Sequence, residues 1–287
     1  MKKTFLTSIV ASALVLTACS STSINSEKNM SITYKEKAVA LLNSIETGEP
    51  KGVSYVNPTN YTQHNLAIGD GLAGFGAVLQ ALPKNSAKVN VIRSFQDGDY
   101  VFTHTDYNFF GPKIGFDVFK FEDGLIVEHW DNLSEKLSQL TPSGHSQIDG
   151  ATAIKDLEKT EENKALVAEF VDNILVKGDY KTLNSFFDGD NYIQHNSAIA
   201  DGVSGLGQAI KAMAENGITM KYTTNHKILG EGNFVLSISE GFFADKPTSF
   251  YDLFRVENGK IAEHWDVLET ITPKNEWKNA NGKFGHL

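Results

Sequence analysis

Apolar residues recur at helical spacing early in each half of this 287-residue chain. Leu166, Phe170 and Ile174 are four residues apart, which places them on one face of a helix. Similar spacing is found at Leu206, Ile210 and Met213, and at Phe75, Leu79 and Leu82. Each half is therefore predicted to begin with helices.

Strand candidates follow the helices and are separated by short turn signals. These are Asp97-Gly98, Asp123-Gly124, Glu231-Gly232 and Asn258-Gly259. Helices followed by a run of antiparallel strands predict an α+β domain. Its sheet must curl around the helices to bury both apolar faces.

The two halves also repeat each other in sequence. The segment YTQHNLAIGDGLAGFG at 61–76 matches YIQHNSAIADGVSGLG at 192–207, and DVFKFEDGLIVEHWD at 117–131 matches DLFRVENGKIAEHWD at 252–266. We therefore predict two tandem domains of about 110 residues each, a usual size for an independent core.

The predicted boundaries follow from the repeats and from polar segments rich in Pro, Gly and Ser. They are a signal peptide at 1–19, a flexible spacer at 20–33, a first domain at 34–140, a linker at 141–160, a second domain at 161–275 and a tail at 276–287.

The first residues have the pattern of an export signal. Lys2 and Lys3 precede an apolar stretch that is too short to span a bilayer. The sequence Leu-Thr-Ala-Cys that ends at Cys19 resembles a bacterial lipobox. That resemblance implies lipidation of Cys19, and Ser20 implies sorting to the outer membrane, facing the periplasm. The alternative is an ordinary signal cleaved after Ala18.

Composition narrows the class of partner. The net charge of −9 disfavours nucleic acid and anionic lipid surfaces. With Cys19 as the single cysteine, the protein must fold by apolar burial and without disulfide bonds.

A histidine and an aspartate stand two residues apart near the end of each half, at His129 and Asp131 and at His264 and Asp266. On a strand, residues at this spacing share a face. A carboxylate beside an imidazole is an acid/base arrangement, but the same pair also occurs where the two groups only satisfy each other's hydrogen bonds. Periodicity does not show which face of the sheet is concave.

A second polar cluster precedes the later helix in each half. It consists of Gln63-His64-Asn65 in the first half and Gln194-His195-Asn196 in the second. A catalytic role and a structural network are equal alternatives. Asp70 and Asp201 follow at the start of that helix, where we predict that they cap it.

These blocks resemble the SnoaL-like branch of the nuclear transport factor 2-like superfamily, through residues 34–140 and 161–271. The resemblance implies two cone-shaped α+β barrels. In SnoaL-like polyketide cyclases, a carboxylate in the last strands acts as general acid/base in an aldol condensation, without metal or organic cofactor. Asp131 and Asp266 match that carboxylate, with Asp117 and Asp252 next.

The two copies differ at His104, which aligns with Ile238. Many relatives have a histidine on this strand, so the resemblance implies that only the first copy is fully equipped if His104 is functional. A metal site that uses His64, His104, His129 and nearby aspartates is a rival interpretation.

Two functions remain open. One is a lipid-anchored enzyme, of the aldol-condensation, cyclase or isomerase type, that transfers protons on a small carbonyl compound. The other is a non-catalytic module of the cell envelope that binds a small apolar ligand or acts as a scaffold. If His64, His104, Asp117, His129 and Asp131 converge on one cavity, the enzyme is favoured.

Because domains of this superfamily commonly pair through their sheets, we predict that the two domains pair within one chain. The chain without residues 1–19 should then be a monomer in light scattering. A stable dimer would contradict this prediction.

Overall fold

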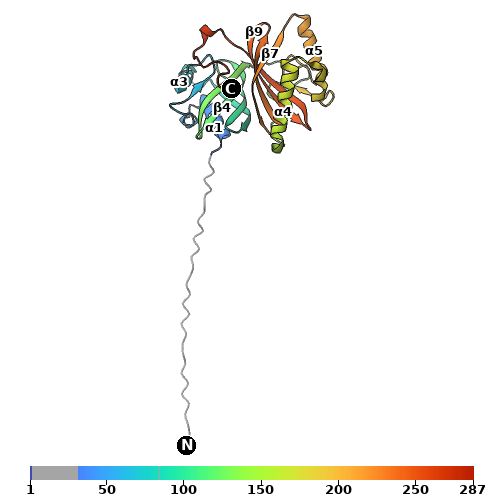
Figure 1. Cartoon of the computed structure of the whole chain (residues 1–287). Helices are drawn as coiled ribbons and strands as arrows, with labels where there is room; N and C mark the ends of the chain where they lie inside the picture. Colours follow the sequence, from blue (N-terminus) through green and yellow to red (C-terminus); the bar gives the residue numbers. More distant parts are fainter. Residues whose placement is uncertain (2–31, 84) are drawn as a thin grey trace. The chain divides into compact units, whose positions relative to one another are not determined.

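The computed structural model describes Met1, 32–83 and 85–287 (Figure 1). The predicted signal peptide, Cys19 and most of the spacer lie outside the described residues. Within the part of the chain that is described, no helix is long and apolar enough to cross a membrane.

The first half begins with helices and ends with strands, as predicted. Its elements are α1 (Tyr34–Thr47), α2 (Pro50–Val53), β1 (Thr62–Gln63), α3 (Gly71–Ala81), β2 (Lys88–Asp97), β3 (Tyr100–Asn108), β4 (Pro112–Glu122) and β5 (Leu125–Glu135). Thr33 and Glu36 form a capping box that fixes the start of α1.

The second half has the same order with more irregular helices. It consists of η1 (Leu157–Lys159), α4 (Thr160–Phe170), the π-helix η2 (Val171–Val176), η3 (Tyr180–Phe186), β6 (Ile193–Gln194), α5 (Gly202–Glu215), β7 (Met220–Glu231), β8 (Phe234–Phe243), β9 (Lys246–Glu257), β10 (Lys260–Thr270) and η4 (Lys274–Glu276).

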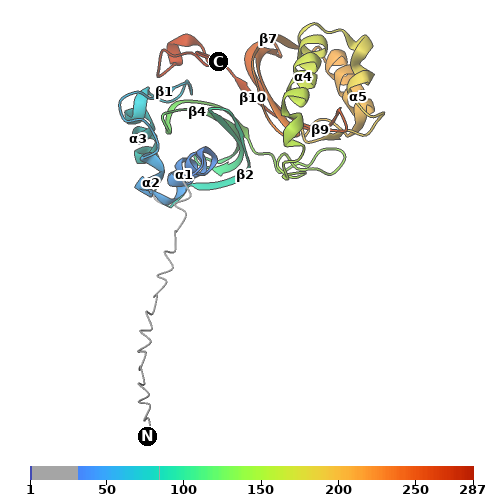
Figure 2. The same ribbon diagram turned by 60° about the horizontal axis from the view of Figure 1, so that its bottom comes forward.

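Each half contains one five-stranded sheet, in the order β1-β5-β4-β3-β2 and β6-β10-β9-β8-β7. The short β1 and β6 run parallel to β5 and β10, and the other pairs are antiparallel. Register shifts interrupt pairing between β4 and β5 and between β9 and β10, and such bulges bend strands. Figure 2 shows the first sheet arched around its helices. The α+β prediction with two curved sheets is confirmed.

Two of the predicted turns have the backbone that their sequence favours. Asp123 and Gly124 join β4 to β5 with φ of 49° and 80°, and Asn258 and Gly259 join β9 to β10 with φ of 51° and 70°. Positive φ at both central residues is the type I′ pattern that Asp-Gly and Asn-Gly adopt readily.

The convex faces of the two sheets pack against each other in one apolar cluster. Its fully buried aromatic members are Phe95, Phe102, Phe116, Trp130, Phe234, Tyr251 and Trp265. The Asn132 amide donates to the Ser249 and Val267 carbonyls at 2.9 and 2.7 Å, which ties β5 to the second sheet. The two sheets therefore share one apolar core, and the oligomeric state stays a prediction.

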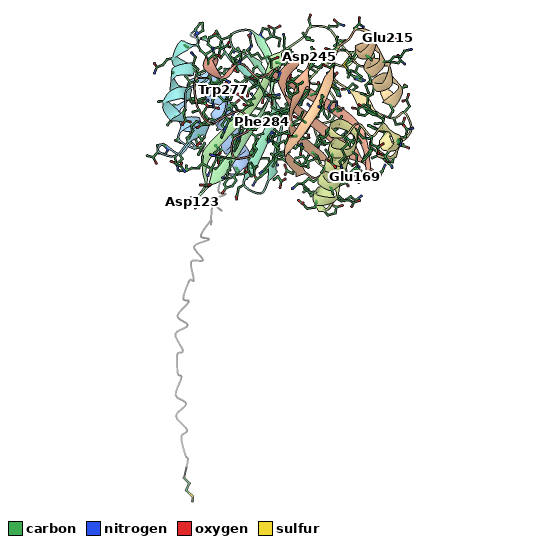
Figure 3. The ribbon with its side chains drawn as sticks, turned by 45° about the horizontal axis from the view of Figure 1, so that its top comes forward. Asp123, Glu169, Glu215, Asp245, Trp277 and Phe284 are labelled. Atoms are coloured by element: carbon green, nitrogen blue, oxygen red, sulfur yellow. The ribbon has the colours of Figure 1, made fainter. Side chains whose placement is uncertain are left out.

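The segments that follow each sheet cross to the other half. After β5, the linker passes the second sheet, where Trp265 Nε1 donates to the Asp149 carbonyl at 2.9 Å. After β10, the tail returns to the first sheet, where Trp130 Nε1 donates to the Gly285 carbonyl at 3.0 Å. Phe284 of the tail, which is labelled in Figure 3, packs against the shared core. Its ring stacks on His226, at 4.3 Å between ring centres. No pattern in the sequence predicted this exchange.

Arg93 is the charged residue that holds the linker in place. Its guanidinium donates to the carbonyls of Ile148, Asp149 and Ala151 at 3.2, 2.5 and 2.7 Å, and lies 4.2 Å from the ring centre of Trp265. Burial lowers its pKa to about 10, so Arg93 remains charged at neutral pH.

Replacing Arg93 by Met should lower the free energy of unfolding by about 3 kcal/mol or more, because three backbone carbonyls of the linker lose a charged donor that is itself buried. Urea denaturation measures this. Lys88→Met is the control. Its ion pair with Glu46 is exposed, so it should change stability by less than about 1 kcal/mol. Equal effects for the two variants would contradict the anchoring role.

Candidate active site

Each half encloses a pocket between the concave face of its sheet and its helices. The volumes are about 270 Å³ in the first half and about 290 Å³ in the second. Helices and strand ends supply mostly apolar walls, with Leu41, Phe75 and Val78 among them in the first half. The polar groups gather on the sheet, so the pockets suit small apolar ligands with a few polar atoms.

In the first pocket, a chain of hydrogen bonds runs across the sheet. The Tyr107 hydroxyl donates to Asp117 Oδ2 at 2.6 Å, and Asp117 Oδ1 lies 3.1 Å from His129 Nε2. His129 Nδ1 donates to Gln63 Oε1 at 3.1 Å, and Gln63 Nε2 donates to the Tyr61 hydroxyl at 3.2 Å. Because Tyr61 accepts from Gln63, its own O–H is left to donate to a ligand.

Asp131 stands directly opposite Asp117 in the register of β5 and β4 and lines the same pocket. Asn65 Nδ2 donates to Asp131 Oδ2 at 2.6 Å. The other oxygen, Oδ1, has no hydrogen-bond partner among the described residues, although Lys283 Nζ of the tail lies 3.7 Å from it. A buried carboxylate oxygen without a hydrogen bond is uncommon and marks Asp131 as the candidate base.

The second pocket has the same network, built from Tyr222, Asp252, His264, Gln194 and Tyr192. Asp266 again accepts from an asparagine, here Asn196, at 2.7 Å. The matching repeats thus place the same carboxylates and imidazole on both pocket floors.

His264 and Asp266 in the second pocket have shifted proton affinities. Burial opposes a charge on His264, but the hydrogen bond that its Nε2 donates to Asp252 and the charges of Asp266 and Asp252 outweigh burial and raise its pKa. Burial raises the pKa of Asp266, and the nearby Asp252 adds to that effect.

The phenol that donates to the central aspartate comes from a different strand in each half. Tyr107 lies on β3, and Tyr222 lies on β7. A side chain added at Gly115 would come within 3.2 Å of the Tyr107 ring, so glycine leaves room for that tyrosine. In the second half Tyr222 instead stacks on Phe250, at 4.2 Å between ring centres. Both pockets therefore have a tyrosine that donates to the central aspartate, although this tyrosine comes from a different strand in each half.

Neither pocket is lined by three of the predicted site residues, which are His64, His195 and His104. His64 and His195 stack on Trp130 and Trp265, at 4.7 and 4.6 Å between ring centres, on the side of the sheet that faces the other half. Successive residues of a strand point to opposite faces. Gln63 lines the pocket, so His64 next to it points to the other face. Their assignment as catalytic residues is corrected.

His104 also faces the junction of the halves. Arg93 Nη1 lies 3.1 Å from its Nδ1, and its ring stacks on Phe116 at 4.4 Å. Burial and the charge of Arg93 hold its pKa well below the usual value. His104 therefore lies outside the first pocket, and the aligned Ile238 does not line the second one. Asp117, His129 and Asp131 converge, as do Asp252, His264 and Asp266.

The predicted capping by Asp70 and Asp201 is wrong in its hydrogen bonds. Each residue stands at the N-cap position, but neither side chain caps the helix. Asp70 Oδ1 accepts from Gln63 N, and Asp201 Oδ1 accepts from Gln194 N, at 3.0 and 2.9 Å. These aspartates fix the strand that carries the pocket glutamine.

Sequence reasoning missed several functional candidates. Tyr61 and Tyr192 begin the repeated blocks, so their recurrence was a usable signal. Tyr107 and Tyr222 do not align with each other, and Lys283 lies outside both repeats, so no pattern indicated them.

Four groups of described residues bring three potential metal ligands within 4.8 Å. They are Asp117, His129 and Asp131; Asp252, His264 and Asp266; His64, Glu128 and His286; and His145, Asp149 and His195. In the two pocket groups, a histidine and both aspartates already bond to protein side chains.

The fold and the pockets define an α+β protein with an acid-lined cavity in each half. No family model matches the chain, and no curated protein is similar to it. Similar solved structures each match part of it.

An NTF2-like protein of unknown function from Cytophaga hutchinsonii is 16% identical, with a TM-score of 0.32, and the match covers 37% of this chain and 94% of that one. A putative ketosteroid isomerase from Kribbella flavida is 14% identical, with a TM-score of 0.33 and coverage of 40% and 84%. An LEH-like epoxide hydrolase from M. tuberculosis is 22% identical, with a TM-score of 0.30 and coverage of 39% and 85%.

Replacing Asp252 by Asn should lower the pKa of His264, because the ring loses its hydrogen-bonded carboxylate. A raised folded pKa stabilises the fold below the unfolded value of about 6.5, and this contribution is lost as pH rises through the folded pKa. The variant should therefore lose more stability at acidic than at alkaline pH. NMR titration of the ring and urea denaturation at two pH values measure both effects.

Asp117→Asn is the matched control, since it makes the same change in the other half. It should leave the pKa of His264 unaltered. An unchanged His264 titration in the Asp252 variant would show that the pair does not set its proton affinity.

Proposed function

We propose that this protein is a cell-envelope lipoprotein whose pockets catalyse proton transfer on small carbonyl compounds, as in isomerisation or intramolecular aldol condensation. The observation that carries the proposal is the buried Asp131, which lines the apolar pocket, with one oxygen held by Asn65 and the other, 3.7 Å from Lys283 Nζ, without a hydrogen bond among the described residues. The lipobox at Cys19 supports attachment to a membrane.

The pocket offers a base and a hydrogen-bond donor on one wall. Asp131 Oδ1 would accept a proton from the carbon next to the carbonyl, and the electron pair of that C–H bond would move to the carbonyl oxygen. The Tyr61 hydroxyl would donate a hydrogen bond to the resulting enolate oxygen. Burial raises the pKa of Tyr61, so the phenol keeps its proton at neutral pH.

The enolate can then react in two ways, and each of them returns Asp131 to its unprotonated form. In an isomerisation, Asp131 returns the proton to a different carbon of the same molecule. In an aldol condensation, the enolate carbon bonds to a second carbonyl carbon, and the new alkoxide takes the proton from Asp131. The remaining network through His129 and Asp117 fixes Gln63 and hence the Tyr61 hydroxyl.

The apolar walls support this chemistry in two ways. They exclude water, which strengthens the hydrogen bond to the enolate, and they select a substrate that is mostly hydrocarbon. A pocket of about 270 Å³ admits a compound of one or two rings.

Deuterium exchange at the carbon next to the carbonyl of 2-tetralone, followed by NMR, tests the proposal in the first pocket. The background carries Asp266→Asn, so that the second pocket lacks its matching carboxylate. Adding Asp131→Asn should slow the catalysed exchange at least about 100-fold, because general base catalysis contributes about 10² to 10⁴.

The control is His104→Ile, which copies the residue of the second half at a position outside the pocket and should leave the exchange rate unchanged. If 2-tetralone binds and its exchange is the same with and without Asp131, the pocket is a binding module and the enzyme proposal fails. If the compound neither binds nor exchanges, the proposed substrate class is wrong.

A further inference from the structure

The tail places a second histidine, His286, near His64 on the convex side of the first sheet. Glu128 Oε2 lies 3.2 Å from His64 Nε2 and 2.8 Å from His286 Nδ1. These three ligand atoms come from the segment before α3, from β5 and from the end of the chain. His64 is fully buried, whereas the His286 side chain is 66% exposed.

The hydrogen bonds of His64 determine which of its nitrogens is free. Its Nδ1 lies 2.9 Å from the Gly282 carbonyl, which can only accept, so this nitrogen carries the proton. In the neutral ring, Nε2 then directs a lone pair at the Glu128 carboxylate.

His64 Nε2, His286 Nδ1 and Glu128 Oε2 already lie within 4.8 Å of one another, and a cation between them would bind the His64 lone pair and the carboxylate together. Two imidazoles and one carboxylate are a ligand set that zinc adopts, with a fourth position for water. At zinc–ligand distances of about 2.0–2.1 Å, tetrahedral ligand atoms lie about 3.3 Å apart. The His64 contact already has this spacing, and the exposed His286 can move outward by the small remaining amount.

We propose that His64 Nε2, His286 Nδ1 and Glu128 Oε2 form a binding site for a divalent transition metal such as zinc. The surroundings suit that role. The Gly282 carbonyl and the Trp130 ring orient His64, as partners of metal-bound histidines commonly do, and Lys120 Nζ holds the other Glu128 oxygen at 3.2 Å. The exposed His286 provides access from solvent.

The second half lacks the third ligand at the equivalent place. Trp130 bonds to Gly285 and Trp265 bonds to Asp149, so the next residues, His286 and Gly150, correspond. A side chain at Gly150 would come within 2.1 Å of Glu263 Oε1, so the linker has glycine there. His195 still lies 2.9 Å from Glu263, and the second imidazole near it, that of His145, forms with Asp149 and His195 a group of described residues that does not include Glu263. The combination of two imidazoles with the strand glutamate is therefore found in the first half, where a bound metal would fasten the tail to the sheet.

Calorimetric titration with zinc ions tests the site, on the chain without residues 1–19, which removes the Cys19 thiol but none of the described fold from residue 32 on. We expect one zinc per chain at pH 7.5 and weaker binding at pH 5.5, because the imidazoles must be unprotonated. His286→Ala should weaken binding more than tenfold, and bound zinc should raise the melting temperature only when His286 is present.

Glu128→Gln, which removes the anionic ligand and keeps its shape, should also weaken binding. His145→Ala is the matched control, because His145 belongs to the His145, Asp149 and His195 group of the second half. Absence of zinc binding, undiminished binding by the His286 variant, or loss in the His145 variant alone would each overturn the proposal. None of these results depends on the pocket chemistry.

Discussion

The mutual burial of the two convex sheet faces is the constraint on which the rest of the structure depends. Each sheet carries large aromatic side chains on that face, Trp130 and Trp265 among them, and a half standing alone would expose them to water. Because the convex faces cover each other, the concave faces are free to enclose pockets against the helices. The face that stabilises the protein and the face that offers chemistry are thereby separated.

Alternation along the last strands connects these two faces. On β5, Glu128 and Trp130 point toward the other half, and His129 and Asp131 point into the pocket. The repeated block that ends in Glu-His-Trp-Asp therefore encodes the interface and the site together. A one-residue slip would move the tryptophan into the pocket and the aspartate into the apolar junction, so the register is under strong constraint.

Much of the fold could be predicted from the sequence. Helical spacing, turn dipeptides and the repeated blocks led to two α+β units with the correct order of elements. The converging pairs at 129 and 131 and at 264 and 266 were also predicted. The orientation of the sheet was not, because both faces of these strands carry apolar and charged residues, and only packing against the helices or the other half decides between them.

Contacts between distant segments decide the roles that the local sequence leaves open. The repeated Gln-His-Asn blocks are compatible with catalysis or with a structural network, and the rings of His64 and His195, like that of His104, lie on the interface side and stack on an aromatic partner. Asp70 and Asp201 occupy helix starts but bond to a neighbouring strand instead. In both cases a contact between distant segments replaced the local role that sequence alone suggests.

The linker and the tail each cross to the other half, and this exchange makes the two pockets unequal. Lys283 is buried and reaches the Asp131 carboxylate of the other half, while the linker offers no lysine at the matching place in the second half. A chain that emerges with its amino end first completes the body of the first half long before position 283 is made. The pocket of the first half is therefore completed only after residue 283 has been synthesised.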